Sequence, residues 1–497
     1  MTRHFRSLLA ATALIGLATA GTAFAEARTD LVLGMSIEPS GLDPTIASPV
    51  AIGQVVWQNL FEGLVKVDEE GKIEPELASS WDISDDGLTY TFHLRDGVTF
   101  QDGSAFNADT AKFTIDRIIA PDSVNGQKAL YKAIESTDAP DESTLVLHLS
   151  APSADLLYWL GFPAAVMVSP DSVDTNTTKP VGTGPFEFSD WKKGNEVTFV
   201  KNPNYWGEAP KLDKVTFRFI ADPQAQAAAL TSGGVDAIPE FGAPELVDQF
   251  KKNSDFTVEI GATGMEVVAG MNNAEKPFSD VKVRQALMMA IDRQAIIDAT
   301  NSGYGTPIGS HFSPSDAGYE DLTGVLPYDP AKAKALLAEA GYPNGFTFTM
   351  KVPNRAYAER AAEIMQAYFA QIGVTMNIES SEFPAKWIQD VFKDTNYDMT
   401  IIGHAEPLDI GIYSRHPYYF NYNNPEFDAT MASVAAATTE DERIAAYQKA
   451  EEILANDVPA LFLYAWPKIG VWKAGLNGLW VNEPVPSNDV TGVYWSE

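Results

Sequence analysis

Histidines are the most reactive side chains that this chain offers, and their spacing matches no complete catalytic signature. Five of them follow residue 25: His93, His148, His311, His404 and His416. His93 and His148 lie in segments of alternating polarity, which predicts solvent-facing positions on strands. His404 and His416 flank an irregular stretch, where they could form a metal-binding pair, contact a ligand or do neither. Paired carboxylates are too abundant in this acidic chain to mark a site.

Enzyme motifs of defined spacing are missing from the sequence. There is no G-x-x-x-x-G-K-[ST] phosphate loop, no G-x-S-x-G nucleophile elbow and no H-E-x-x-H zinc helix. Gly182-Thr183-Gly184 lacks the third glycine of a dinucleotide loop and is followed by Pro185. The stretch 82–87 resembles the start of a calcium loop, but His93 stands where the bidentate glutamate is required. We therefore predict a protein that is not an enzyme, with no catalytic residue, metal or cofactor assigned.

Composition narrows the remaining function classes. The 497 residues include 35 Lys and Arg and 67 Asp and Glu, a formal charge of −32. Such an acidic balance disfavours nucleic acid and anionic membrane surfaces as partners, because both are bound by clustered cations. The chain has no cysteine, which excludes disulfides, thiolate catalysis and iron–sulfur clusters. With 45% hydrophobic and 21% charged residues, a globular protein is expected.

The N-terminus has the pattern of an export signal. Arg3 and Arg6 precede an apolar run from Leu8 to Ala20, and small residues at Ala23 and Ala25 suit signal peptidase. No later stretch reaches 18 apolar residues. We expect residues 1–25 to be a signal peptide that is cleaved near Ala25, which leaves a soluble periplasmic protein.

The positions of apolar residues predict alternating strands and helices. Period-2 alternation predicts strands over 88–94, 145–149, 215–219, 346–352 and 374–378. Capping residues and terminal glycines predict helices over 281–299, 331–340, 359–372 and from Thr439 to about Asn456. Several helices are followed by strands, which favours α/β lobes.

Several short motifs together resemble a known family. They are Glu76–Asp82, Asp85–Phe100 with Asp102-Gly103, Gly182–Phe186, Lys201–Trp206, Lys276–Leu287, Tyr328–Ala333 and Ala450–Leu454. This set is similar to the periplasmic solute-binding proteins of the peptide/nickel/opine ABC importers, and its order is kept over almost the whole mature chain. The same residues also suit a structural role, as turns, apolar anchors and a buried helical stripe.

The resemblance implies the type II periplasmic binding protein fold, with two α/β lobes around a ligand cleft and an extra subdomain. The first lobe would comprise about 26–263 and 477–497, with the inserted subdomain at about 70–180. The second lobe would comprise about 264–476. Closure of the lobes on a solute, followed by docking on an ABC permease, would be the mechanism.

The resemblance also places a ligand-contacting stretch at 400–409. In the peptide-binding branch an aspartate here holds the ligand's amino group, so Asp409 and Glu406 are the candidate carboxylates. His404 stands where that branch has tryptophan. Arg355, with Tyr357 beside it, and Arg415 are candidates for a ligand carboxylate. Tyr413 and Trp387 are candidate pocket walls, and Met265 lies close to the expected crossing between the lobes. Ser36 belongs to the stretch that the resemblance makes the contact loop of the first lobe.

We therefore expect the periplasmic component of an ABC importer, a monomer that captures an amphoteric solute such as a short peptide or an opine. Three alternatives stay open: a metal-chelate or haem carrier of the same fold, a chemosensory role, and an exported hydrolase without a recognised motif. The ligand's identity does not follow from the sequence.

Overall fold

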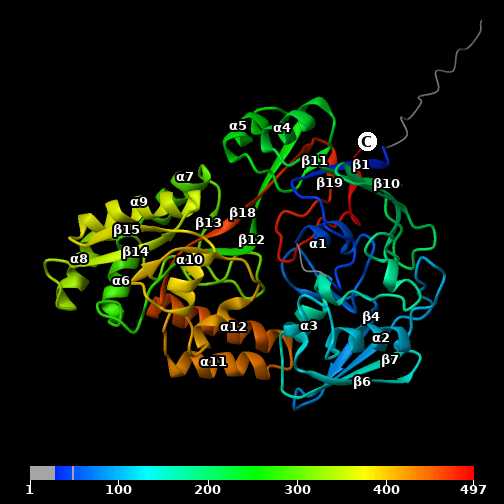
Figure 1. The fold of residues 1–497 in the computed structure, drawn as a ribbon, viewed down its shortest axis with the longest axis horizontal. Helices are drawn as coiled ribbons and strands as arrows, with labels where there is room; N and C mark the ends of the chain where they lie inside the picture. The colour runs from blue at the N-terminus through cyan, green and yellow to red at the C-terminus, as the bar shows by residue number, and fades with distance from the viewer. Residues whose placement is uncertain (1–27, 47–49, 497) are drawn as a thin grey trace, which may run out of the picture.

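The computed structural model describes residues 28–46 and 50–496. The predicted signal peptide lies outside these residues. No helix among the described residues is long and apolar enough to cross a bilayer. Figure 1 shows two halves, joined by two long strands that run from one half into the other.

A nine-stranded sheet extends through both halves. Its order is β17 (Ile402–His404), β12 (Phe256–Gly270), β18 (Ala460–Lys473), β11 (Ala237–Ile238), β1 (Asp30–Met35), β10 (Lys214–Phe219), β9 (Glu196–Lys201) and β8 (Phe186–Lys192), and β13 (Thr306–Pro307) pairs with β18. β12 and β18 are antiparallel from Phe256 opposite Lys473 to Gly270 opposite Ala460. Their pairing is interrupted between Ala262 and Glu266, so the ladder is irregular where the chain passes between the halves.

Smaller sheets build the rest of each half. An antiparallel sheet in the order β4 (Ala78–Ile83), β5 (Thr89–Leu94), β7 (Thr144–Leu149) and β6 (Ile134–Asp141) forms the subdomain of the first half. A parallel sheet in the order β15 (Thr375–Ser381), β14 (Thr347–Pro353) and β16 (Met399–Thr400) lies in the second. Two-stranded pairs are β2 (Val65–Val67) with β3 (Ile73–Pro75), and β19 (Leu476–Asn477) with β20 (Tyr494–Trp495).

The helices lie mostly against these sheets (Figure 1). In the first half they are α1 (Val50–Val56), α2 (Ala108–Ile119), α3 (Leu156–Leu160), α4 (Pro223–Ser232) and α5 (Val247–Lys251). In the second half they are α6 (Val281–Met289), α7 (Arg293–Asn301), α8 (Pro330–Glu339), α9 (Ala356–Gln371), α10 (Ala385–Trp387), α11 (Pro425–Ala436) and α12 (Glu440–Asp457). A 3₁₀ segment, η6 (Asp409–Ser414), follows β17 closely.

The predicted elements agree with these bounds except at one helix. The expected helix 281–299 is two helices, α6 and α7. Asp292 begins the second one, because its carboxylate accepts hydrogen bonds from the backbone N–H groups of Gln294 and Ala295. His93 and His148 are solvent-facing strand residues as predicted, and each bonds a neighbouring aspartate.

The buried apolar residues form several clusters. One core cluster contains only residues between Val267 and Tyr464, and another contains only residues between Leu64 and Met167. A further cluster combines residues of both halves, from Leu31 to Val493. The second lobe of about 264–476 and the subdomain of about 70–180 therefore stay a prediction. We use first lobe and second lobe in this sense below.

Candidate functional site

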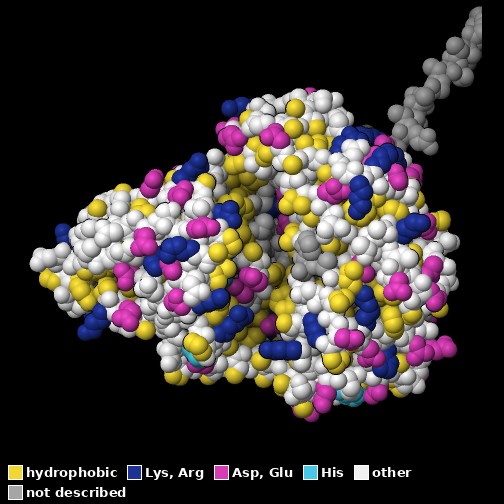
Figure 2. Space-filling view, viewed as in Figure 1, with side chains coloured by type: hydrophobic (Ala, Val, Ile, Leu, Met, Phe, Trp, Pro, Cys, Tyr) yellow, Lys and Arg dark blue, Asp and Glu magenta, His cyan; other side chains and the backbone are white. Residues whose placement is uncertain are grey.

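A cleft lies between the two lobes. Figure 2 shows the surface hollowed between the two halves, with apolar and charged side chains along its walls. A pocket of about 280 Å³ lies over the crossing strands. Its lining combines both lobes and the crossing: Ser36, Pro223, Gln226, Glu240, Phe241, Gly242, Pro244, Thr263, Asn301, Trp466, Pro467, Lys468 and Ile469. We call it the cleft pocket. Thr263 belongs to the irregular part of β12, so the pocket adjoins the point where the lobes connect.

The cleft pocket is lined by an acidic and a basic side chain, Glu240 and Lys468. Glu240 has an exposed side chain at the wall, and Lys468 is almost fully buried, at 3% exposure. Surrounding protein desolvates the Glu240 carboxyl and Glu483 repels its charge, so the pKa of Glu240 is raised to about 8. Gln54 donates hydrogen bonds to both carboxylates. A cationic group of a ligand beside Glu240 would favour the charged form of its carboxyl.

Three residues predicted from the sequence lie at or next to this pocket. Ser36 lines it directly. The Tyr357 ring packs edge-on against Trp466 at 5.6 Å, and its hydroxyl accepts a hydrogen bond from the Gly403 N–H at 3.0 Å. The Met265 side chain packs against Gly403, so that a Cβ at Gly403 would lie 3.2 Å from the Met265 sulfur. Tyr357 thus contacts Trp466, which lines the pocket, and Gly403, which Met265 also contacts.

Three further predicted residues are exposed on the second lobe. Arg355 lies over the ring of Phe383 at 5.0 Å, and Arg415 lies over Tyr418 at 5.5 Å. Glu406 is exposed in the segment between β17 and η6, and the next residue, Pro407, approaches Gly264 of the crossing strand. None of the three makes an ion pair among the described residues. Their charges therefore remain available to a ligand.

The last four predicted residues are mostly buried: Trp387, Tyr413, His404 and Asp409. The Trp387 indole donates a hydrogen bond to the Thr400 hydroxyl at 2.8 Å. Tyr413 is stacked on Phe420 at 4.6 Å and is only 1% exposed. None of the four lines the cleft pocket in this structure, and a direct contact with ligand stays a prediction for each of them.

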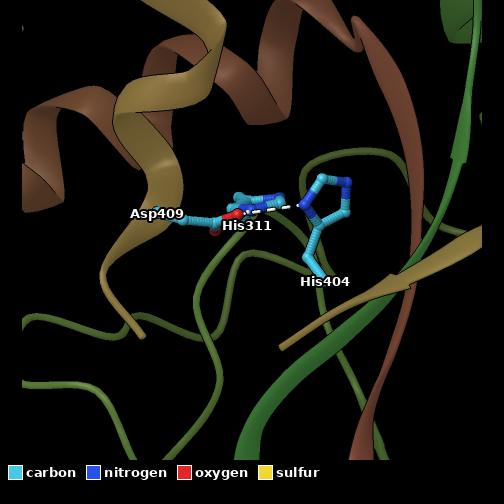
Figure 3. A group of neighbouring side chains, drawn as sticks. All are labelled: His311, His404 and Asp409. Atoms are coloured by element: carbon cyan, nitrogen blue, oxygen red, sulfur yellow. Dashed lines mark hydrogen bonds and ion pairs between the residues drawn. The ribbon is translucent and has the colours of Figure 1, made fainter. Parts of the chain in front are cut away.

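Asp409 is held between two histidines (Figure 3). One carboxylate oxygen bonds His311 Nε2 at 2.6 Å and the other bonds His404 Nδ1 at 3.0 Å. The far nitrogens of the same rings bond tyrosines: His311 Nδ1 pairs with the Tyr413 hydroxyl at 3.1 Å, and His404 Nε2 pairs with the Tyr419 hydroxyl at 2.8 Å. We call His311, His404 and Asp409 the buried triad.

Electrostatics in the buried triad favour a charged carboxylate. Burial alone would raise the pKa of Asp409, but the two imidazoles outweigh it and lower that pKa below its usual range. Burial also lowers the pKa of His311, which therefore favours the neutral ring. No role for His311 follows from the sequence, because it lies 98 positions before Asp409 and no local pattern reports the contact. The suggested partner of His404, His416, instead bonds Asp428 at the surface.

Comparison with known proteins identifies the family. Residues 72–426 match the family described as bacterial extracellular solute-binding proteins, family 5. The chain belongs to this family. It is also 32% identical, over 94% of its length and 95% of the relative's, to the glutathione-binding protein GsiB of Salmonella typhimurium.

Solved structures agree with the family assignment. HbpA2 from Haemophilus parasuis aligns with a TM-score of 0.87 and 26% identity, over 94% of this chain and 100% of that one. The periplasmic binding protein DppA from Helicobacter pylori, in complex with the peptide STSA, aligns with a TM-score of 0.68 and 28% identity, over 95% and 99%. Two predictions from the sequence are therefore confirmed: the two-lobed α/β fold, and the function as the periplasmic solute-binding component of an ABC importer.

Proposed function

We propose that this solute-binding protein captures a small amphoteric molecule, a short peptide or an opine-like compound, in the cleft pocket and delivers it to an ABC permease. The observation that carries this proposal is the meeting of Glu240 and Lys468 in one pocket lined from both lobes. An acid and a base on the walls of a cleft match a ligand that bears an amine and a carboxylate. A relative that is named for glutathione, an amphoteric tripeptide, supports the same ligand class.

The second lobe would complete the site on closure. Glu406 would add a second carboxylate for the ligand's amine, and Arg355 or Arg415 would bind its carboxylate with two N–H groups. Trp466, Tyr357 and Met265 would supply apolar contact, and Ser36 a hydroxyl. Closure excludes water, so each ligand charge needs a protein partner on one wall or the other. His404, Asp409, Tyr413 and Trp387 would shape the wall from behind.

The irregular pairing of β12 supports movement at the crossing. Thr263, Gly264 and Met265 have no partner in the β12–β18 ladder. A short unpaired stretch can absorb a change in backbone angles without loss of the flanking hydrogen bonds. The first lobe (26–263 and 477–497) and the second lobe (264–476) would rotate about it as rigid bodies. The protein would work as a monomer without catalytic activity, after removal of residues 1–25.

The test is a ligand screen on the mature protein, freed of co-purified solute by unfolding and refolding. Thermal shift followed by calorimetry would compare glutathione, di- and tripeptides and octopine with maltotriose, haemin and nickel–histidine. Saturable one-to-one binding of an amphoteric compound and none of maltotriose is expected. Tight binding of haemin or the nickel chelate alone would instead establish the carrier alternative. Hydrolysis of the peptides during the titration would contradict the non-enzymatic assignment.

A further inference from the structure

The buried triad contains three metal-ligating side chains in one place. The possible donor atoms of His311, His404 and Asp409 lie within 4.8 Å of one another. Two imidazole nitrogens and one carboxylate oxygen are donors that Zn²⁺ accepts in tetrahedral sites. The three side chains come from different parts of the second lobe and point toward one another (Figure 3). The fold thus brings His311 to within reach of His404 and Asp409, which are five positions apart in the sequence.

The hydrogen bonds around the triad are of the kind found around metal-binding histidines. A ligating histidine needs its second ring nitrogen held by a hydrogen bond, which fixes the orientation of the ring. Tyr413 provides this contact for His311, and Tyr419 provides it for His404. Both tyrosines are 1% exposed. Without metal, the triad-facing nitrogens carry the protons that bond Asp409. With metal, each ring would carry its proton on the nitrogen facing the tyrosine.

Two further acidic side chains are buried close to the triad. Glu266 lies on β12 directly opposite His404 of β17 in the antiparallel register. It is 3% exposed, and its Oε2 atom is buried without a hydrogen-bond partner. The carboxyl of Asp316, 6% exposed, adjoins that of Glu266.

We propose that His311, His404 and Asp409 bind one divalent late-transition-metal ion, Zn²⁺ by their donor set, as a structural site inside the second lobe. His404 and Asp409 keep 7% and 8% of their side-chain surface accessible, whereas His311 is fully buried. The site would fasten η6 to β17 and thereby fix the short segment between them that carries Glu406. It is separate from the cleft pocket and does not depend on the ligand proposed above.

Cobalt is the most informative probe, because four-coordinate Co²⁺ absorbs strongly in the visible range whereas weakly bound, hydrated Co²⁺ does not. The mature protein would be stripped with EDTA, desalted and titrated with Co²⁺, and Zn²⁺ affinity would be measured by competition with a chromophoric chelator. We expect one ion per chain and an increase in thermal midpoint with Zn²⁺. His404→Gln and Asp409→Asn should weaken Zn²⁺ binding at least 100-fold. Tyr419→Phe should weaken it about 10- to 100-fold.

The matched control is His416→Gln, which removes an exposed histidine that also bonds an aspartate. It should bind Zn²⁺ within threefold of the wild-type protein. Circular dichroism would establish that each variant is folded. If the buried variants do not fold, the wild-type cobalt spectrum and Tyr419→Phe decide the question. The proposal is wrong if the wild-type protein shows no one-to-one visible cobalt band and no thermal shift with Zn²⁺, or if His416→Gln abolishes binding while His404→Gln retains it.

Discussion

Trp206 donates a hydrogen bond from its indole nitrogen to the buried carboxylate of Glu62 across 2.8 Å. Tyr205 and Thr183 also bond this carboxylate, each at 2.7 Å. Thr183 and the Tyr205-Trp206 pair belong to two separate family motifs, and Glu62 is only 1% exposed. The motifs therefore converge on one buried acid of the first lobe. This explains why they identify the scaffold and carry no information about the ligand.

We expect Trp206→Phe to destabilise the protein by about 1–3 kcal/mol, because it removes one donor from a buried carboxylate and keeps most of the apolar ring. Chemical denaturation of the mature protein measures this difference. The control is Trp495→Phe, which removes an exposed indole hydrogen bond of 3.0 Å to the Asp30 carbonyl. An exposed contact should contribute less than about 0.5 kcal/mol. Equal losses of unfolding free energy in the two variants would show that the hydrogen bond to Glu62 stabilises the protein no more than an exposed hydrogen bond does.

Gly182 lies against the backbone of Leu60 in the same region. A Cβ on Gly182 would be 1.9 Å from the Leu60 carbonyl oxygen, which is backbone and cannot rotate away. Gly182→Ala should therefore cost at least about 1–3 kcal/mol, as overpacking does. The matched control is Gly324→Ala, because a Cβ there has no atom within 4 Å. Denaturation midpoints that do not differ between these variants would contradict the close approach of the two segments.

Stability should fall as the pH rises, because of Glu76. Burial, and next the neighbouring Glu62, raise the pKa of Glu76 from 4.5 to about 8. The folded state thus keeps a proton that the unfolded state loses above pH 4.5. The stabilisation is complete below that pH and is lost as the pH approaches 8. A difference of one bound proton between the folded and unfolded states changes the free energy of unfolding by at most about 1.4 kcal/mol per pH unit.

Denaturation at pH 5, 6, 7 and 8 measures this dependence, and Glu76→Gln should flatten it. Glu363, an exposed residue on α9, provides the control substitution Glu363→Gln, which should leave the slope unchanged. A wild-type free energy of unfolding that rises from pH 5 to pH 8, with the same slope in Glu76→Gln, would refute the assignment of a buried protonated acid.

The charged residues of the cleft should determine affinity for an amphoteric ligand. Truncating a group that pairs with a buried ligand charge typically costs about 2–5 kcal/mol, or roughly 30-fold or more in affinity. We expect such losses in calorimetry for Glu240→Gln, Glu406→Gln and at least one of Arg355→Ala and Arg415→Ala. Asp409→Asn should have a smaller effect on the ligand, because its oxygens are already bonded to histidines.

The control for the cleft variants is Glu245→Gln, an exposed acid that bonds Gln224 close to the pocket without lining it. Its affinity should stay within threefold of the wild-type value. If Glu240→Gln, Glu406→Gln, Arg355→Ala and Arg415→Ala all bind as the wild-type protein does, the assignment of the site is wrong. If the ligand proves to be uncharged, the charge argument is wrong as well.

Local sequence patterns predict most of the helices and strands, but they do not predict which residues meet in the candidate site. Alternation such as Tyr90, Phe92 and Leu94 predicts a strand because period 2 is a local property. The break at Asp292 was missed because the apolar stripe continues past it and conceals the internal cap. Glu240 and Lys468 come together only through the crossing strands, far apart in the sequence. No local pattern reports such a contact, and the same holds for His311 and Asp409.

Solution scattering from the mature protein tests the central claim, capture of a solute by closure of two lobes, most directly. The probe is the amphoteric compound that binds most tightly in the screen, at a concentration that saturates the protein, with maltotriose as the negative control. The account predicts a smaller radius of gyration with the amphoteric compound and no change with maltotriose. Identical scattering curves with and without a saturating ligand would contradict it.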